Sequence, residues 1–176
     1  MKEYYDIFKK ILEDQHDDPK WNNARFGKIK VISNTKVGTV GQLFVEKICE
    51  KLELKYENPK NKEGKNTSQS PWDLKIEDIT FEIKAATEDV NGSFQFNHLR
   101  YHRDYEAVLC IGIAPNDVYF NIFSKKQISS GEAGNLVTME KAGEASYKLT
   151  KRKEKLFTFD FFENEIKNFI VKFKKI

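Results

Sequence analysis

Apolar residues recur at helical spacing in three segments of the chain. We therefore predict an amphipathic helix over residues 2–14, a second helix over residues 39–53 and a third that follows Asp160. Thr39 is the expected N-cap of the second helix, and Asp160, with Glu163 in the capping-box position, that of the third. The apolar positions that support these helices are Tyr4, Phe8, Ile11 and Leu12, then Gly41, Phe44, Val45, Ile48 and Leu52, and finally Phe162, Ile166, Phe169, Ile170 and Phe173.

Stronger strand patterns lie in the middle of the chain. The stretch "PWDLKIEDITFEIKAAT", residues 71–87, reads as a hairpin with a tight two-residue turn at Glu77 and Asp78 and apolar positions on one face. The continuous apolar run over residues 106–114 predicts a strand that is buried on both faces. Residues 117–123 predict a further strand after a Pro-Asn turn.

Weaker patterns fill the remaining segments. We expect a short strand over residues 29–32 and one or two edge strands within an irregular segment, residues 136–159. Residues 57–70 and 129–135 are rich in polar and turn-forming residues and are expected to be loops. Residues 87–105 are expected to form a connection with room for a short helix.

The composition supports a single folded domain over residues 1–176. This length is typical of one domain, and a content of 39% hydrophobic and 13% aromatic residues can fill its core. The order of elements predicts an α/β (α+β) architecture in which helices flank a central mixed β-sheet. Cys49 and Cys110 lie in apolar runs and are expected to be buried thiols. No apolar run approaches the ~18 residues of a membrane span, so we expect a soluble, cytoplasmic protein.

The hairpin brings like charges together. With a two-residue turn, Asp73 lies opposite Glu82 with their β-carbons roughly 5 Å apart, and Lys84 lies on the same face. A four-residue turn would instead place Asp73 opposite Lys84, still beside Glu82, and a three-residue turn would break the arrangement. Two carboxylates at this distance suit Mg²⁺, which prefers oxygen ligands and keeps positions for water and substrate phosphate. A lysine beside them can orient the attacking water and offset phosphate charge. An exposed sheet face, on which Lys75 and Lys84 neutralise the acids, remains the alternative.

The run "PWD", eight residues and then "EIK" resembles the PD-(D/E)xK nuclease motif, in which an acid opens one strand and Glu-x-Lys follows on the next. The resemblance covers about residues 38–123, and the downstream run is similar to small type II restriction endonucleases. Two departures are visible: Trp72 separates Pro71 from Asp73, and the spacing from aspartate to glutamate is short. The resemblance implies a restriction-endonuclease-like core of the αβββαβ type.

The resemblance also implies a Mg²⁺-dependent DNA endonuclease of the type II restriction class, in which Mn²⁺ can replace Mg²⁺. Asp73 and Glu82 would bind the cation, the Ile83 carbonyl would be a third oxygen donor, and Lys84 would act on the water. Glu46, in "GTVGQLFVEKI", matches a helix glutamate that often joins the metal site in this fold. Helical periodicity alone turns Glu46 toward solvent, and an active-site cleft is also solvent, so both interpretations stay open.

Polar and basic residues crowd the segment after the hairpin. Glutamine and asparagine can bond adenine, and arginine can bond guanine; a polar loop packed by its own aromatic residues is the alternative. The net charge of +3 indicates no global basic field, but local basic segments can bind phosphates, or form a solvated surface. The candidate DNA-binding residues are Gln95, Asn97, His98, Arg100, Arg103, Lys36, Lys151 and Arg152.

The expected partner is double-stranded DNA. A palindromic target would require a homodimer with one site per strand, and the family resemblance implies a cognate DNA methyltransferase that protects the host genome. Two alternatives remain open: a nicking repair nuclease or Holliday-junction resolvase of the same superfamily, and a non-catalytic DNA-binding module on the same fold.

Overall fold

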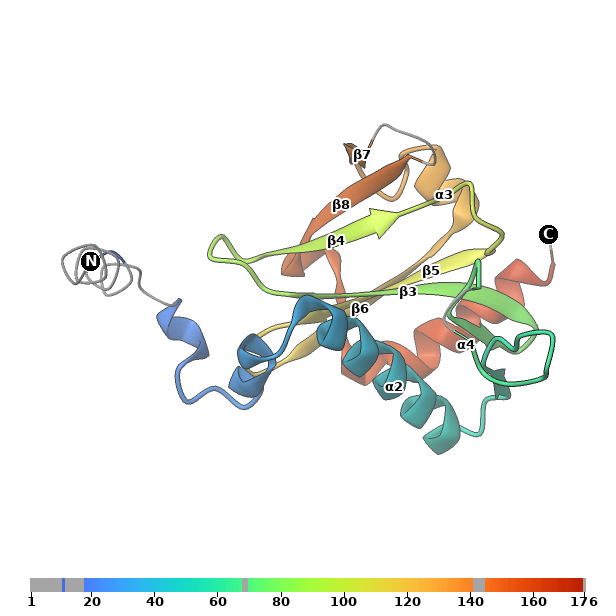
Figure 1. The fold of residues 1–176 in the computed structure, drawn as a ribbon, viewed down its shortest axis with the longest axis horizontal. Helices are drawn as coiled ribbons and strands as arrows, with labels where there is room; N and C mark the ends of the chain where they lie inside the picture. Colours follow the sequence, from blue (N-terminus) through green and yellow to red (C-terminus); the bar gives the residue numbers. More distant parts are fainter. Residues whose placement is uncertain (1–10, 12–17, 68–69, 141–144, 176) are drawn as a thin grey trace, which may run out of the picture.

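Two sheets and two helices form three layers, with helices α2 and α4 on one face of a six-stranded sheet and a three-stranded sheet on its other face (Figure 1). The computed structural model describes residue 11 and residues 18–67, 70–140 and 145–175. The prediction of an α+β class with a mixed sheet and flanking helices is confirmed. The helix expected over residues 2–14 lies outside the described residues, apart from Ile11.

The six-stranded sheet has the order β1-β2-β3-β5-β6-β9, in which β3 and β5 are parallel and all other neighbours are antiparallel. The run expected to be buried on both faces is β5, and every one of its residues is buried. The bounds are Tyr56–Glu57 for β1, Leu74–Ile76 for β2, Ile79–Thr87 for β3, Ala107–Ile113 for β5, Val118–Ser124 for β6 and Phe157–Thr158 for β9.

The hairpin of β2 and β3 has the predicted register. Leu74 pairs with Phe81 and Ile76 pairs with Ile79, so the connection is the two-residue turn Glu77-Asp78. Both turn residues have positive φ, 48° and 72°, as a type I′ hairpin turn requires. The apolar residues of the hairpin therefore face the helices, and its polar residues face the other side of the sheet.

Helix α2 begins one and a half turns earlier than predicted. It spans Asn34–Lys51, and the cap is Ser33, whose hydroxyl accepts a hydrogen bond from the Lys36 amide, rather than Thr39. The additional turns bury Val37, so the buried stripe is Val37, Gly41, Val45 and Cys49. Gly41 is required for close contact with the sheet, because a β-carbon there would lie 2.6 Å from the Ala85 β-carbon.

Helix α4, Phe162–Phe173, covers the same face of the sheet near the end of the chain. Phe162, Ile166 and Ile170 are buried, as the pattern predicted. The expected cap at Asp160 and the capping box with Glu163 were wrong. A 3-10 turn, η4 (Phe159–Phe161), precedes the helix, so Asp160 is inside that turn and no side chain caps α4.

The second sheet, in the order β4-β8-β7, was largely missed by the sequence patterns. Residues 87–105 contain β4 (Ser93–Leu99) instead of a helix, and residues 136–159 contain β7 (Leu136–Glu140) and β8 (Ser146–Arg152) as well as β9. Phe94 and Phe96 alternate with polar neighbours and are fully buried. The crossover between parallel strands β3 and β5 therefore runs through a strand, and the helix that an αβββαβ core would place there is absent from the described residues.

Shorter elements complete the described chain. Residues 29–32 do not form a strand, because Ile29 belongs to a 3-10 helix, η2 (Gly27–Val31), whose amides bond three residues back. A further 3-10 turn, η1, spans Pro19–Trp21, another, η3, spans Lys153–Lys155, and a one-turn helix, α3, spans Lys125–Ser129. Among the described residues, no helix combines the length and the apolar character that crossing a bilayer demands.

Candidate active site

Asp73, Glu82 and Lys84 converge beside β3, at the residue that directly precedes β2. Both β3 residues point away from the helices, and the Lys84 Nζ lies 2.6 Å from the Glu82 Oε1. Asp73 lies just beyond the last paired residues of the ladder, where its amide donates to the Phe81 carbonyl at 2.8 Å. Its Oδ2 accepts a hydrogen bond from the Ile83 amide at 2.7 Å, which turns the carboxylate toward β3.

The negative charge of Glu82 acts on Asp73. Burial, and next the negative charge of Glu82, raise the pKa of Asp73 from its ordinary 3.8 to about 6. The Ile83 amide and the positive charges of Lys84 and Arg103 act in the opposite direction, but they do not cancel the effect. The ionised form of Asp73 is therefore destabilised here, and a bound cation or proton would stabilise it.

Buried oxygen atoms at the same place lack partners within the described part of the chain. Glu82 is 3% exposed, and its Oε2 has no hydrogen-bond partner there; the buried hydroxyl of Tyr105 is in the same state. Buried polar atoms are almost always satisfied in folded proteins. A carboxylate oxygen that is free beside a second carboxylate fits an oxygen-preferring divalent cation.

The donor set fits Mg²⁺ better than zinc. Within residues 18–67, 70–140 and 145–175, no group of three His, Cys, Asp or Glu residues is arranged around a common metal position. Structural zinc sites need four such ligands and catalytic ones three, whereas Mg²⁺ is commonly held by one or two carboxylates with waters and substrate oxygens. Asp73 and Glu82 can supply those two carboxylates.

Glu46 shares a pocket with one acid of the candidate site, Asp73. It lines a pocket of about 350 Å³ together with Gln42, Trp72 and Asp73. The Gln42 side-chain amide donates to the Glu46 Oε1 at 3.2 Å and to the Asp73 carbonyl at 3.4 Å. Glu46 is thus connected to the backbone of Asp73 through Gln42 rather than grouped with the two acids.

A second pocket, of about 340 Å³, opens where β3 ends between the start of α2 and β4. Gln95 and Asn97 lie on its β4 wall and are exposed, and Asn34 lies on the α2 side. The pocket also includes Ala85, which directly follows Lys84. Three of the predicted DNA-binding residues, Gln95, Asn97 and His98, therefore line an open pocket that reaches the residue after Lys84.

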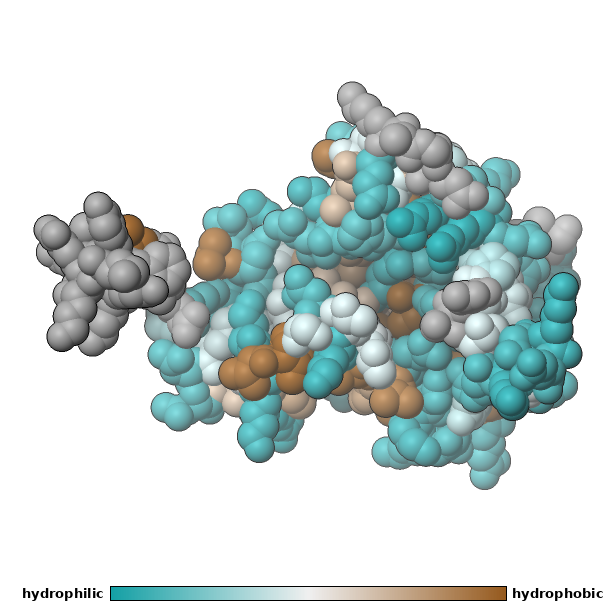
Figure 2. Space-filling model, in the orientation of Figure 1, coloured by the Kyte–Doolittle hydropathy of each residue, from teal (hydrophilic) through white to brown (hydrophobic). Residues whose placement is uncertain are grey.

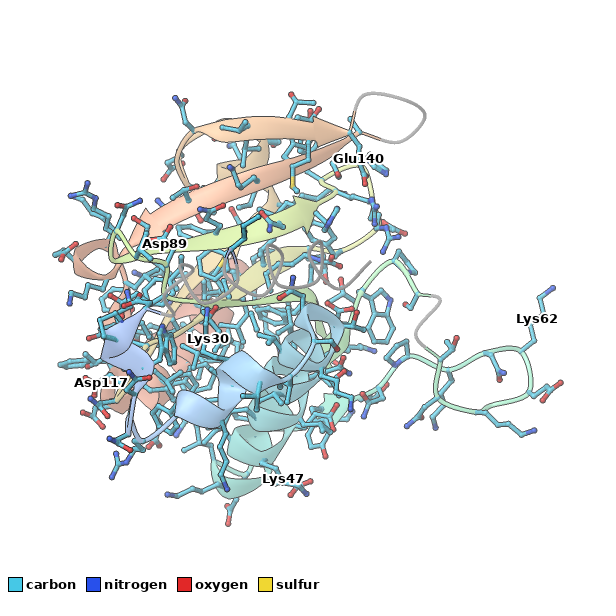
Figure 3. All side chains as sticks on the ribbon, turned by 60° about the vertical axis from the view of Figure 1, so that its left-hand side comes forward. Lys30, Lys47, Lys62, Asp89, Asp117 and Glu140 are labelled. Atoms are coloured by element: carbon cyan, nitrogen blue, oxygen red, sulfur yellow. The ribbon has the colours of Figure 1, made fainter. Side chains whose placement is uncertain are left out.

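His98, which also lines this pocket, and Arg100 both contact one acid, Glu140. The His98 Nδ1 lies 3.6 Å from one carboxylate oxygen of Glu140, and an Arg100 guanidinium nitrogen lies 3.3 Å from the other. Hydrogen bonds from Ser146 and Arg100, and the charges of His98 and Arg100, hold the pKa of Glu140 below its usual range, against a smaller opposing effect of burial. Asp89 lies near one end of β4, and Glu140, from β7, lies near the other end (Figure 3).

The remaining basic candidates are dispersed. Lys36 is exposed in the first turn of α2, and Arg152 is exposed on β8. The Lys151 ammonium instead lies 5.2 Å from the centre of the Phe123 ring, on the inner face of the second sheet, and burial lowers its pKa. Arg103 is near the two acids, since its charge acts on the pKa of Asp73.

Sequence reasoning missed the site roles of Tyr105, Gln42 and Asp89. Tyr105 precedes a buried strand, so the sequence suggests only an aromatic residue of the core. In the structure it lies close enough to Glu82 for that negative charge to raise the pKa of Tyr105, although burial raises this pKa more. Gln42 carried one available signal, because it lies one turn before Glu46 on the same side of a helix. Asp89 lines the second pocket from the turn before β4, a strand that the sequence patterns did not predict.

Comparisons with known protein families, with curated proteins and with solved structures found no significant match to this chain.

Proposed function

We propose that this protein is a Mg²⁺-dependent endonuclease that hydrolyses phosphodiester bonds in double-stranded DNA. The observation that carries the proposal is the convergence of Asp73, Glu82 and Lys84, with a raised pKa at Asp73 and an unpartnered buried oxygen on Glu82. This arrangement on adjacent strands is the one expected from the PD-(D/E)xK resemblance. An exposed, mutually neutralised sheet face would not bury Glu82 to 3% exposure.

Each residue has a defined role in this proposal. Asp73 and Glu82 hold the cation, which when bound supplies charge stabilisation for the scissile phosphate. Lys84, 2.6 Å from Glu82, orients the attacking water and offsets the charge that develops on phosphate oxygens. The Ile83 carbonyl is a further oxygen donor from the same strand, and Arg103 adds a positive charge toward incoming phosphate.

A type II restriction role is the specific form of the proposal. It includes a homodimer acting on both strands of a palindromic target and a cognate DNA methyltransferase. The polar wall formed by Gln95 and Asn97 supports sequence reading, because amide side chains discriminate between bases whereas lysines bind phosphate without sequence preference.

A cleavage assay tests the proposal. The purified protein is incubated with a long, sequenced, unmethylated DNA in the presence of Mg²⁺ or of EDTA. Discrete double-strand fragments are expected with Mg²⁺ and none with EDTA; nicks alone, or cut junctions, would identify the repair class instead.

Variants test the residues. Lys84→Ala is expected to lower the cleavage rate by about 10²- to 10⁴-fold while DNA binding is largely retained. Lys62→Ala is the matched control, because Lys62 is exposed in a loop that projects from the body of the protein (Figure 3). Wild-type cleavage by both Lys84→Ala and Asp73→Ala would overturn the proposed mechanism.

A further inference from the structure

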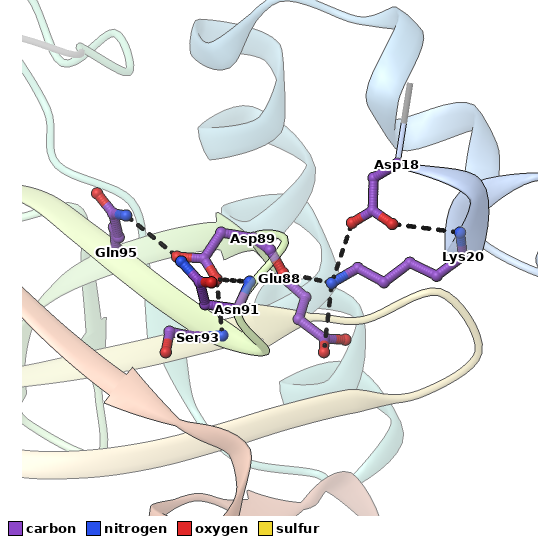
Figure 4. A network of polar contacts seen from close by, with 7 residues as sticks. All are labelled: Asp18, Lys20, Glu88, Asp89, Asn91, Ser93 and Gln95. Atoms are coloured by element: carbon purple, nitrogen blue, oxygen red, sulfur yellow. Dashed lines mark hydrogen bonds and ion pairs between the residues drawn. The ribbon is translucent and has the colours of Figure 1, made fainter. Parts of the chain in front are cut away.

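The side chain of Gln95 is held by a turn that precedes its strand. Asp89, at the turn between β3 and β4, accepts hydrogen bonds from the Asn91 and Ser93 amides at its Oδ1, both at 2.9 Å. Its Oδ2 accepts a hydrogen bond from the Gln95 Nε2 at 3.1 Å. Figure 4 shows these contacts as one network that leads from the turn to β4.

The same turn is anchored on its other side. Lys20 donates to the Asp89 carbonyl oxygen and lies 3.5 Å from the carboxylate of Glu88 and 3.2 Å from that of Asp18 (Figure 4). Glu88 is 7% exposed, so this ion pair is largely shielded from solvent. Lys20 therefore holds the backbone of Asp89, and the two amides hold its carboxylate.

The chemistry of Asp89 decides which way the Gln95 amide faces. Burial disfavours its charge, but the donors from Ser93, Gln95 and Asn91 and the charge of Lys20 outweigh burial and hold the pKa of Asp89 below its usual range. An ionised carboxylate can only accept hydrogen bonds. Gln95 must therefore turn its nitrogen toward Asp89, which leaves its carbonyl oxygen and one N–H for a ligand in the pocket.

We propose that Asp89 is a positioning residue that presets Gln95 to read an adenine in the major groove of the DNA substrate. Adenine is the base that displays a hydrogen-bond donor, N6, next to an acceptor, N7, and it matches the acceptor and donor that Gln95 still has free. Guanine displays two acceptors there, cytosine one donor and thymine one acceptor. The inference rests on the proposed function and adds which base one side chain recognises.

Geometry supports access to a base edge. Gln95 and Asn97 are exposed on β4, and Thr150, which pairs with Gln95 across the ladder, is exposed on β8. At this end of the three-stranded sheet, beyond the residues that pair with β7, the polar face is formed by the two antiparallel strands β4 and β8, and the major groove can admit two such strands. The pocket in front of it reaches Ala85, which follows Lys84 along β3 and whose side chain faces α2.

The substitution Asp89→Asn gives a directional test. The two backbone amides at the Oδ1 position need an acceptor, so the asparagine oxygen must stay there and its NH₂ group must face Gln95. The Gln95 amide is then expected to reverse, accept from that NH₂ group and present two N–H donors to the pocket. Two donors match the N7 and O6 acceptors of guanine.

The experiment is cleavage of a duplex library with randomised positions, in Mg²⁺, followed by sequencing of the cut ends. For the wild type we expect one position with a strong preference for adenine, which is lost when 7-deazaadenine replaces that adenine. Asp89→Asn should lower the preference for adenine over guanine at that position by at least about tenfold and leave the other positions unchanged. Asp117→Asn, at an exposed acid in the β5–β6 turn, should leave the whole profile unchanged.

Each other outcome has a defined meaning. If the wild type cuts without an adenine preference, or if Asp89→Asn cuts with an unchanged profile, the inference is overturned and the proposed nuclease stands. If Asp89→Asn does not fold, as judged by circular dichroism, Gln95→Leu replaces it and should remove the preference at the same single position; an unchanged profile overturns the inference. If the wild type cuts no DNA under any condition, the proposed function fails and this inference fails with it.

Discussion

Removing the charge of Asp73 should stabilise the protein in the absence of divalent cations. The pKa of Asp73 is raised from 3.8 to about 6, and a shift of roughly two units corresponds to about 3 kcal/mol at about 1.4 kcal/mol each. Because the folded state binds this proton more tightly than the unfolded state, the cost is absent below pH 4. It builds up as the pH rises from about 4 to about 6, and it is fully present at pH 7. Asp73→Asn removes the charge and keeps an oxygen that can accept from the Ile83 amide.

Thermal unfolding in EDTA measures this effect. For a chain of 176 residues, about 3 kcal/mol corresponds to a rise of about 6–12 °C in Tm, expected for Asp73→Asn at pH 7 and absent at pH 4. Asp117→Asn is the control and should change Tm little at either pH. Adding Mg²⁺ should raise the Tm of the wild type, since a ligand that binds only the folded state stabilises it, and should have little effect on Asp73→Asn.

The reasoning would be refuted by a lower Tm of Asp73→Asn at pH 7 in EDTA, because Asp73 would then stabilise the fold without a metal. An equal shift of both proteins by Mg²⁺ would separately show that the cation binds elsewhere.

Three further predictions concern the fold that holds the site. Gly41→Ala should destabilise the protein by about 1–3 kcal/mol, since the new β-carbon would lie 2.6 Å from that of Ala85, and Ala85→Gly in the same chain should recover most of the loss in urea titrations. Cys49 and Cys110, whose pKa values burial raises to about 12, should react with a thiol reagent at pH 8 only after unfolding; reaction of the native protein would contradict their burial. Asp78→Gly should stabilise the hairpin by roughly 1 kcal/mol, because glycine adopts the φ of 72° without the strain of a left-handed conformation, and a lower midpoint in urea would argue against the observed turn.

The hairpin could be predicted because its determinants are local. Two alternating runs separated by two residues allow one register that puts every apolar side chain on one face, and that register is observed. The same holds for β5, whose continuous apolar run is long enough to exclude an exposed strand. For these two elements, the local pattern of apolar residues was enough to predict the observed strands.

Strand β4 could not be predicted for a physical reason. A bulge falls between Phe96 and Leu99, and His98 adopts a φ of 56°, so Leu99 is buried at a position where strict alternation would have exposed it. Read without the bulge, the apolar spacing from Phe94 to Leu99 is compatible with a helix. The strand is stabilised by β8, which lies more than forty residues later in the chain, and no local pattern shows such a partner.

The candidate site also contains residues placed by local sequence and residues placed by distant packing. Asp73, Glu82 and Lys84 meet because one hairpin fixes all three, whereas Arg103 and Tyr105 reach them from the segment that leads into β5. The packing of the two sheets determines which residues outside the hairpin lie near the acids. The sequence patterns therefore gave Arg103 a different role and did not identify Tyr105. The sharpest test of the proposed chemistry therefore combines a variant on the hairpin with a variant outside it. Arg103→Ala should raise the pKa of Asp73 further, because its positive charge now lowers that pKa, and the change should appear as a pH-dependent loss of stability that is absent in Asp73→Asn.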